Sequence, residues 1–174
     1  LLRFSDDKYV PGLADMVRRI HDGSDSKVVP QIIHFMKVAR SGWRQTVDTL
    51  ALQEIDAIVE QFGDAVLRAR TAGFDGAELH AAHAYTLASF LSRANRRTGE
   101  YGGDSLEGRL RLIGRVMENV RRKVGADFPV CIRIDAEEFI RDGYTVEDSK
   151  LIALRLAQLG FGFVSLSVGG KFED

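Results

Sequence analysis

Apolar residues recur along the chain with two alternating periods, one typical of helices and one typical of short buried strands. The helical period, with apolar positions three and four residues apart, runs through residues 8–24, 52–74, 106–125 and 145–160. Short apolar runs lie at residues 27–35, 74–80, 128–135 and 161–168. The pattern therefore predicts one helix followed by four strands that are separated by three helices.

Residues that begin or end helices lie where this pattern requires them. Gly73 and Gly125 follow two helical stretches and are expected to end them, and Ser105 is expected to cap the helix that begins at residue 106. Thr145 stands three residues before an acidic residue, which predicts a capping box at the start of the last helix. Pro30 lies inside the first predicted strand and weakens that assignment, because proline cannot donate to a sheet.

Strands that alternate with helices indicate βα units and a parallel sheet. Two architectures fit, a doubly wound sheet and a (β/α)₈ barrel, and no G-x-G-x-x-G motif follows any strand to favour the first. A barrel takes about 250 residues and this chain has 174. The chain also opens without Met, and four strands alone would leave two unpaired sheet edges. We therefore expect it to be part of a longer protein.

Composition narrows the classes of protein. A net charge of −1 gives no overall field for nucleic acid or for an anionic membrane, and no run of 18 apolar residues predicts a membrane span. Cys131 is the single cysteine, so this stretch holds neither an internal disulfide nor a cysteine-based metal site. We expect a cytoplasmic protein with no nucleic-acid or membrane partner.

Polar residues gather where the predicted strands end. They are Gln31, His34 and Lys37; Glu78, His80, His83 and Tyr85; Arg133 and Asp135; and Ser165, Ser167, Gly169 and Gly170. Because side chains alternate between the faces of a strand, Glu78 shares a face with His80, and Arg133 shares one with Asp135. In either architecture, function sits at the carboxyl ends of the strands.

Three interpretations of this group stay open on the residues alone. His80 and His83, with His34 from the neighbouring strand, could supply three zinc ligands, although H-x-x-H by itself is unspecific. The histidines could instead bond to loop carbonyl groups and fill a polar corner. Tyr85 and Arg133 add a proton donor and a fixed cation, which is typical of oxyanion binding with proton transfer.

A resemblance to a known family goes further. The block "AGFDGAELHAAHAYTLASFLSRANRRTGEYGG", with "SLEGRLRL" and "FPVCIRI" after it, resembles the old yellow enzyme family of NADH:flavin oxidoreductases. The family pattern of His, two residues, His or Asn, one residue, Tyr is matched by His80, His83 and Tyr85. Arg133 matches its strand-end arginine and Gln31 a glutamine at the end of an earlier strand.

The resemblance implies the fold and the cofactor. It implies an α/β fold, a (β/α)₈ TIM barrel of which this chain covers roughly strands 3 to 6, so that residues 1–174 are part of a single FMN-binding domain with flanks missing at both ends. It further implies FMN as cofactor, NADH or NADPH as reductant, and a small enone or enoyl compound as substrate. We allow for a homo-oligomer.

The resemblance also implies roles for the matched residues. His80 and His83 would donate hydrogen bonds to the carbonyl oxygen of an α,β-unsaturated substrate, and Tyr85 would protonate its α-carbon. Gln31 and Arg133 would bind the flavin, and no metal site is expected. Asn95, Arg97 and Tyr101 match the family in a loop that we interpret as structural.

The chain departs from the family in two loops, and three rival functions remain. Met36-Lys37 stands where members often have Gly-Arg, and Asp104 and Gly108 replace the usual Ser and Asn, which leaves the backbone path of these loops open. The first rival is the barrel domain of a multidomain 2,4-dienoyl-CoA reductase with flavin and iron–sulfur groups. The second is a non-catalytic truncated barrel. The third is a phosphate-binding lyase or isomerase, for which Lys171 is the one weak catalytic lysine.

Overall fold

Four parallel strands form a single sheet in chain order. The computed structural model describes residues 2–169 and places β1 (Gln31–Ile32), β2 (Ala77–Ala81), β3 (Val130–Asp135) and β4 (Val164–Ser167) side by side in the order β1-β2-β3-β4. The helices are α1 (Val10–Gly23), α2 (Leu52–Thr71), α3 (Thr86–Leu91), α4 (Leu106–Val124) and α5 (Val146–Gln158), with short 3₁₀ turns at Asp7–Tyr9, Val47–Thr49 and Gly99–Tyr101.

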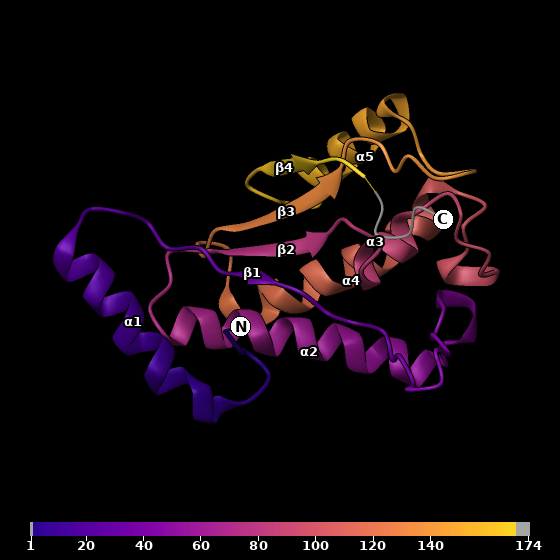
Figure 1. Ribbon diagram of the computed structural model, residues 1–174. Helices are drawn as coiled ribbons and strands as arrows, with labels where there is room; N and C mark the ends of the chain where they lie inside the picture. The colour runs from indigo at the N-terminus through magenta and orange to yellow at the C-terminus, as the bar shows by residue number, and fades with distance from the viewer. Residues whose placement is uncertain (1, 170–174) are drawn as a thin grey trace.

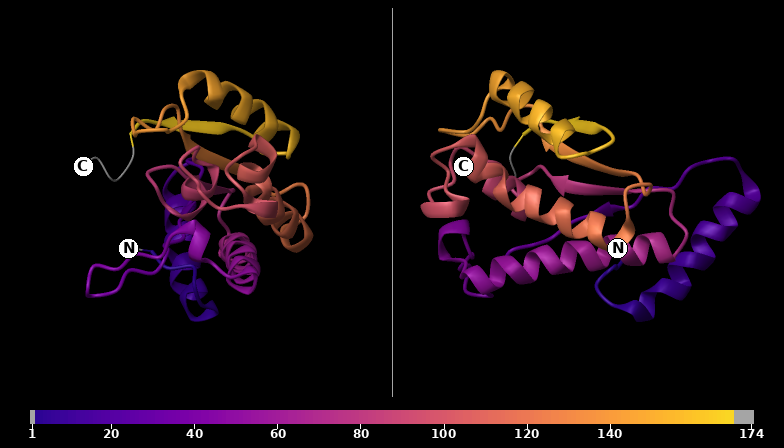
Figure 2. Two further views of the ribbon diagram at one scale, coloured as in Figure 1. Left: turned by 90° about the vertical axis from the view of Figure 1, so that its right-hand side faces the viewer. Right: turned by 180° about the vertical axis from the view of Figure 1, so that it is seen from behind.

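The long helices cover one face of this sheet. Figure 1 shows α2 and α4 running along the same side of the strands, with α5 over β4, and Figure 2 shows the same layering from two further directions. Helix α1 lies apart, beyond the end at which the strands begin (Figure 1). It packs through Leu13 and Val17 against Ala69, Ala72 and Phe74. Among residues 2–169, every helix is too short or too polar to span a lipid bilayer.

The predicted helix boundaries agree with the structure. The Ser105 hydroxyl accepts a 3.0 Å hydrogen bond from the backbone N–H of Gly108, which satisfies one of the free N–H groups at the start of α4. Gly125 ends that helix with φ of 73°, a left-handed conformation that glycine adopts without strain. The backbone N–H of Thr145 donates to the Asp148 carboxylate in the capping box of α5.

The strand register divides the sheet into an apolar face and a polar face. Leu79 is aligned with Ile132, and Ala81 with Ile134. These side chains are fully buried in the core that the sheet shares with the helices. Each large apolar side chain of this kind contributes about 1.5–3 kcal/mol when it leaves water. Because side chains alternate along a strand, the residues between them point to the opposite face.

Two elements differ from the sequence prediction. β1 is only two residues long, because the nitrogen of Pro30 has no hydrogen to donate; the proline carbonyl still accepts from the backbone N–H of Glu78 at 2.9 Å. The stretch after His83, to which the hydrophobic pattern assigned no helix or strand, contains α3, whose buried Leu87, Phe90 and Leu91 lie in the core. Gly170 and Lys171 lie outside the described residues.

Candidate functional site

Polar side chains cover the face of the sheet that points away from the helices. Strand register aligns Gln31 with Glu78, then His80 with Arg133 and Ser165, and finally Asp135 with Ser167. The layers therefore rise step by step toward the carboxyl ends of the strands. This places together the strand-end residues that the sequence predicted to share a face.

The carboxylate of Glu78 is the centre of this polar face. Its Oε1 accepts from Gln31 Nε2 at 2.6 Å and from Arg133 Nε at 3.2 Å, and its Oε2 accepts from the Ser165 hydroxyl at 2.6 Å. These four residues, which we call the Glu78 cluster, come one from each strand. Burial alone would raise the pKa of the Glu78 carboxyl, but the three hydrogen bonds outweigh it and lower that pKa. Glu78 is thus an anion.

Gln31 and Arg133, the two predicted flavin ligands, are brought together through this carboxylate. Strand β2 lies between their strands, and Glu78 Oε1 accepts from both side chains. Arg133 also forms an ion pair with Glu78. The pair occupies only the Nε of the guanidinium among the hydrogen bonds within residues 2–169.

His80 is buried, yet its ring is unsatisfied. The side chain is almost completely covered, and neither Nδ1 nor Nε2 has a hydrogen-bond partner among residues 2–169. Burial, reinforced by His83 and Arg133, lowers the pKa of His80 to about 4, so the ring is neutral at physiological pH. A buried polar group without a partner costs about 1–3 kcal/mol, and such groups gather at functional sites.

His83 is held in an unusual backbone conformation just beyond β2. Its φ is 55° and that of Ala84 is 54°, in the left-handed region that is uncommon for residues other than glycine. The backbone N–H of His83 donates to Asp135 Oδ2 at 2.8 Å, and its Nε2 lies 2.5 Å from the Ser167 hydroxyl. The ends of β3 and β4 therefore fix the turn that carries this imidazole.

Tyr85 completes the predicted trio. Its ring centre lies 5.1 Å from that of His80, and the His80 and His83 ring centres are also 5.1 Å apart. Phe35 packs edge-on against Tyr85 at 4.9 Å. A cavity of about 490 Å³ opens beside Tyr85, between the segment that follows β1 and the start of α3. The structure thus brings the three predicted catalytic side chains into one cluster.

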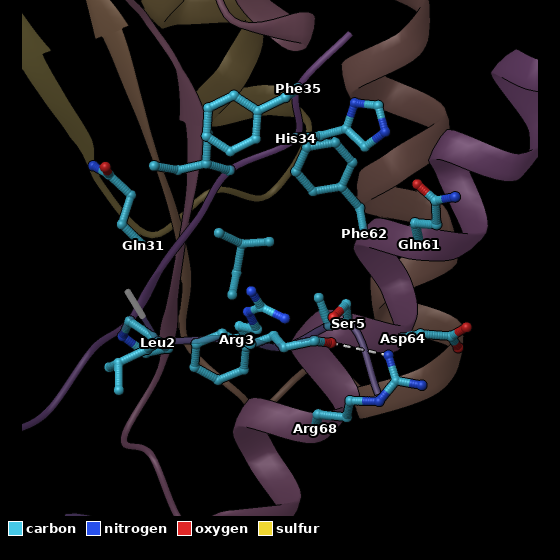
Figure 3. A pocket seen from close by; sticks show the side chains of 15 residues that line it. Leu2, Arg3, Ser5, Gln31, His34, Phe35, Gln61, Phe62, Asp64 and Arg68 are labelled. Atoms are coloured by element: carbon cyan, nitrogen blue, oxygen red, sulfur yellow. Dashed lines mark hydrogen bonds between the residues drawn. The ribbon is translucent and has the colours of Figure 1, made fainter. Parts of the chain in front are cut away.

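His34 does not join this cluster. Its Nδ1 lies 2.8 Å from the Thr86 hydroxyl, and its ring faces Phe62 of α2. Figure 3 shows the His34 imidazole beside Phe62 and Gln61, with the Gln31 amide directed away from them. His34 thus lines a second, largely apolar cavity of about 860 Å³ on the helix side of β1. Lys37, the other residue of this strand end, pairs with Glu54 instead.

Because His34 lies apart from His80 and His83, the zinc interpretation lacks its third ligand. No group of three histidine, cysteine or acidic side chains in residues 2–169 is placed to hold a metal ion.

The loop residues Asn95 and Arg97, interpreted as structural, do make structural contacts. The Asn95 amide donates to two backbone carbonyls, and Arg97 donates to the carbonyls of Val47 and Leu50, both at 2.7 Å.

The sequence did not indicate what Glu78 and Asp135 do. Both were placed at strand ends without a catalytic or flavin-binding role, and each turns out to hold another site residue. The period-two alternation was the available signal, since it puts Glu78 on the face of His80. Which side chains meet across strands depends on register, which a single sequence does not state.

Comparisons with known proteins place the chain in a family. The model of the NADH:flavin oxidoreductase / NADH oxidase family matches residues 36–165, which include His80, His83, Tyr85 and Arg133 but not Gln31. An NADH oxidase from Thermoanaerobacter brockii is 34% identical over 97% of this chain and 28% of that protein. An NADPH dehydrogenase from Geobacillus thermodenitrificans is 34% identical over 94% of this chain and 51% of its own length.

Solved structures confirm the fold class. An amine oxidase from Pseudomonas geniculata N1 that acts on 6-hydroxypseudooxynicotine superposes with a TM-score of 0.82 at 25% identity, over 97% of this chain and 28% of that one. A 2-naphthoyl-CoA reductase superposes with a TM-score of 0.80 at 23% identity, over 95% and 29%. The prediction of a (β/α)₈ barrel of which this chain forms part is therefore correct. The chain spans between a quarter and about half of these proteins.

Proposed function

Because the chain belongs to the NADH:flavin oxidoreductase / NADH oxidase family, we propose that it provides the reaction centre of an FMN-dependent enzyme. This enzyme takes reducing equivalents from NADH or NADPH and reduces the C=C bond of α,β-unsaturated carbonyl compounds. The observation that carries the proposal is the cluster of His80, His83 and Tyr85. Here a buried neutral imidazole without a partner in the described chain lies 5.1 Å from a second imidazole and from a phenol, measured between ring centres.

The residues of the polar face fit the flavin of such an enzyme. Gln31 offers an amide and Arg133 a permanent cation, which suit the polar edge of a flavin ring and the negative charge of its reduced form. The unsatisfied ring of His80 lies in the next layer, on the same face. When bound, FMN would supply the hydride that the reaction needs.

The two imidazoles would bind the carbonyl oxygen of the substrate. Negative charge builds on this oxygen as the β-carbon is reduced, and fixed N–H donors stabilise it most at that stage. The burial of His80 strengthens such a bond, since water competes little there. The loss of one such donor typically costs about 3 kcal/mol of activation free energy, or about a hundredfold in rate.

Tyr85 would deliver the proton that completes the reduction. The Tyr85 hydroxyl is an O–H donor, and its ring lies against His80. Phe35 packs edge-on against Tyr85. Tyr85 also lines a cavity of about 490 Å³ that neither histidine borders. The proton would go to the α-carbon while the histidines hold the oxygen.

The test begins with the visible spectrum of the purified full-length protein. We expect bound flavin, reduction of that flavin by NADH or NADPH without oxygen, and reoxidation by 2-cyclohexen-1-one with cyclohexanone as the product. The absence of flavin absorbance, even after FMN is added, would refute the proposal. Phenol should bind as a mimic of the enolate oxygen, and replacing His80 and His83 together with alanine should weaken that binding; an unchanged affinity would contradict the donor role.

A second candidate is the barrel domain of a multidomain flavin and iron–sulfur enzyme of the 2,4-dienoyl-CoA reductase type. It is favoured by one observation: nearly the whole chain matches only 28% of the T. brockii NADH oxidase, so that relative has much sequence besides. Iron and acid-labile sulfide in the purified full-length protein would support this candidate. Their absence, with FMN present, would favour the single-barrel enzyme.

A further inference from the structure

The buried carboxylate of Glu78 has no part in the proposed chemistry, yet it contacts both proposed flavin ligands. It receives 2.6 Å hydrogen bonds from Gln31 and Ser165 and a 3.2 Å bond from Arg133, so every strand contributes one member of the Glu78 cluster. An acidic residue that served only to hold strands together would not need to select these two side chains. The Glu78 carboxylate affects both Gln31 and Arg133.

Its first effect is on the orientation of the Gln31 amide. An ionised carboxylate can only accept hydrogen bonds, so the group that faces it must be the NH₂ of Gln31. The amide oxygen is thereby left for another partner, and the exposed Gln31 side chain presents it on the polar face. With a neutral partner, which can both donate and accept, either orientation of the amide would be satisfied.

Its second effect is on the charge of Arg133. Glu78 Oε1 engages the Nε of the guanidinium and leaves the two terminal NH₂ groups without a hydrogen bond in residues 2–169. The carboxylate also offsets part of the positive charge of Arg133. Because the side chain of Glu78 is only 12% exposed, water screens this effect weakly.

We propose that Glu78 is a positioning residue for the flavin, which presents the Gln31 amide oxygen and the terminal NH₂ groups of Arg133 to the polar edge of the flavin ring. By offsetting the charge of Arg133, it also makes the reduction potential of the bound flavin more negative than the arginine alone would set. This inference rests on the proposed flavin-dependent function. It assigns to Glu78 a contact with the ligands of the flavin and no contact with substrate.

Two substitutions in the full-length protein separate the two effects. Glu78→Gln removes the charge and keeps the shape, so we expect a more positive flavin potential, since Arg133 then stabilises the reduced anion unopposed, and FMN binding about tenfold weaker because the Gln31 amide can flip. Glu78→Asp keeps the charge but is one methylene shorter, so we expect weaker FMN binding with a smaller change of the potential than in Glu78→Gln.

The measurements are fluorescence titration of the apoprotein with FMN and redox titration of the reconstituted protein. Glu138→Gln is the matched control, because Glu138 is also buried and accepts from Ser92 and Tyr144 but contacts neither Gln31 nor Arg133. It should lower thermal stability and leave the potential unchanged. The control shows whether loss of a buried carboxylate moves the potential by itself.

Each outcome decides a separate point. An unchanged potential in Glu78→Gln, with FMN bound, would overturn the charge effect, and wild-type FMN affinity in Glu78→Asp would overturn the positioning. If Glu78→Gln does not fold, the Asp variant still decides the positioning. If the wild-type protein binds no FMN, the proposed function has failed, and that result is distinct from a failure of the role of Glu78.

Discussion

The backbone N–H of His83 donates a 2.8 Å hydrogen bond to Oδ2 of Asp135, and this bond joins a left-handed turn to the end of β3. The turn needs such an anchor, because left-handed φ values cost a residue with a side chain on the order of 1 kcal/mol. The other oxygen of Asp135, Oδ1, is buried and has no hydrogen-bond partner in the described chain. Oδ2 thus stabilises the turn, whereas the burial of Oδ1 without a hydrogen-bond partner lowers the stability of the fold.

We expect Asp135→Ala and Asp135→Asn to lower the free energy of unfolding by different amounts. Asp135→Ala removes the anchor and should lower the free energy of unfolding by about 1–3 kcal/mol. Asp135→Asn keeps an acceptor for His83 and removes the charge, so it should cost much less. Urea unfolding of the full-length variants measures both, and equal losses would contradict the anchor.

The same residue predicts a dependence on pH. Burial raises the pKa of the Asp135 carboxyl above its ordinary value, so the proton is held more tightly in the folded state than in the unfolded state. The associated stability is present below about pH 4 and is lost as the pH rises through the raised pKa. The Asn variant should therefore gain stability relative to the wild type as the pH rises above about 4. If the difference in stability between the Asn variant and the wild type does not vary with pH, the charge of Asp135 does not destabilise the folded state.

His80 should remain neutral well below the usual range for histidine. Burial, with His83 and Arg133 nearby, lowers its pKa to about 4. Its ring signals in NMR spectra should not change between pH 8 and about pH 5.5, and should titrate near pH 4. The His80→Gln variant identifies the signals. A midpoint above pH 6 would mean that the ring is hydrated in solution.

Tyr85→Phe should slow the reoxidation of reduced flavin by an alkene about a hundredfold and leave flavin reduction by NAD(P)H unchanged, because only the proton donor is lost. Stopped-flow absorbance separates the two half-reactions. Tyr9→Phe is the matched control, since Tyr9 lies next to α1 and its hydroxyl accepts from Arg3 within residues 2–169. Alkene reduction at the wild-type rate in Tyr85→Phe would assign the proton to another donor.

Gly103→Ala should strongly destabilise the loop before α4. A Cβ atom at this position would lie 1.9 Å from the carbonyl oxygen of Asn95, and backbone cannot yield cheaply, so we expect a loss of about 3 kcal/mol or more. Gly12→Ala is the control, because a Cβ atom there would meet nothing within 4 Å in a helix, where alanine is favoured by about 1 kcal/mol. Urea unfolding should show changes of opposite sign.

The sequence predicted the architecture well because hydrophobic periodicity and helix-end chemistry are local. Helices α2, α4 and α5 begin and end close to the predicted positions, with Ser105, Gly125 and Thr145 at their predicted ends. β1 was predicted too long: Pro30 marked the assignment as weak, but the apolar run by itself does not show where the pairing begins and ends. α3 was not predicted, because a helix of six residues, five of them buried, is too short to display a helical period.

The site, like the fold, has a part that local sequence predicted and a part that it did not. His80, His83 and Tyr85 follow one another along the chain, so a motif could identify them, and the structure places them together. The hydrogen bonds of Glu78 and Asp135 join residues 47 to 87 positions apart, and they exist only through the register of the sheet. The orientation of His34 toward α2 likewise depends on packing against Phe62. Long-range geometry of this kind is not written in any local pattern.

The Glu78 cluster also bears on how the chain folds as it is synthesised. Glu78 is synthesised 47 residues after Gln31 and 87 residues before Ser165. Of the three donors to its carboxylate, the Ser165 hydroxyl is therefore the last to be synthesised. Until β4 pairs with β3, burial of this anion is only partly compensated, which disfavours premature closure over the polar face. Among the four strands β1 to β4, β4 is thus the last to supply a hydrogen-bond donor to this carboxylate.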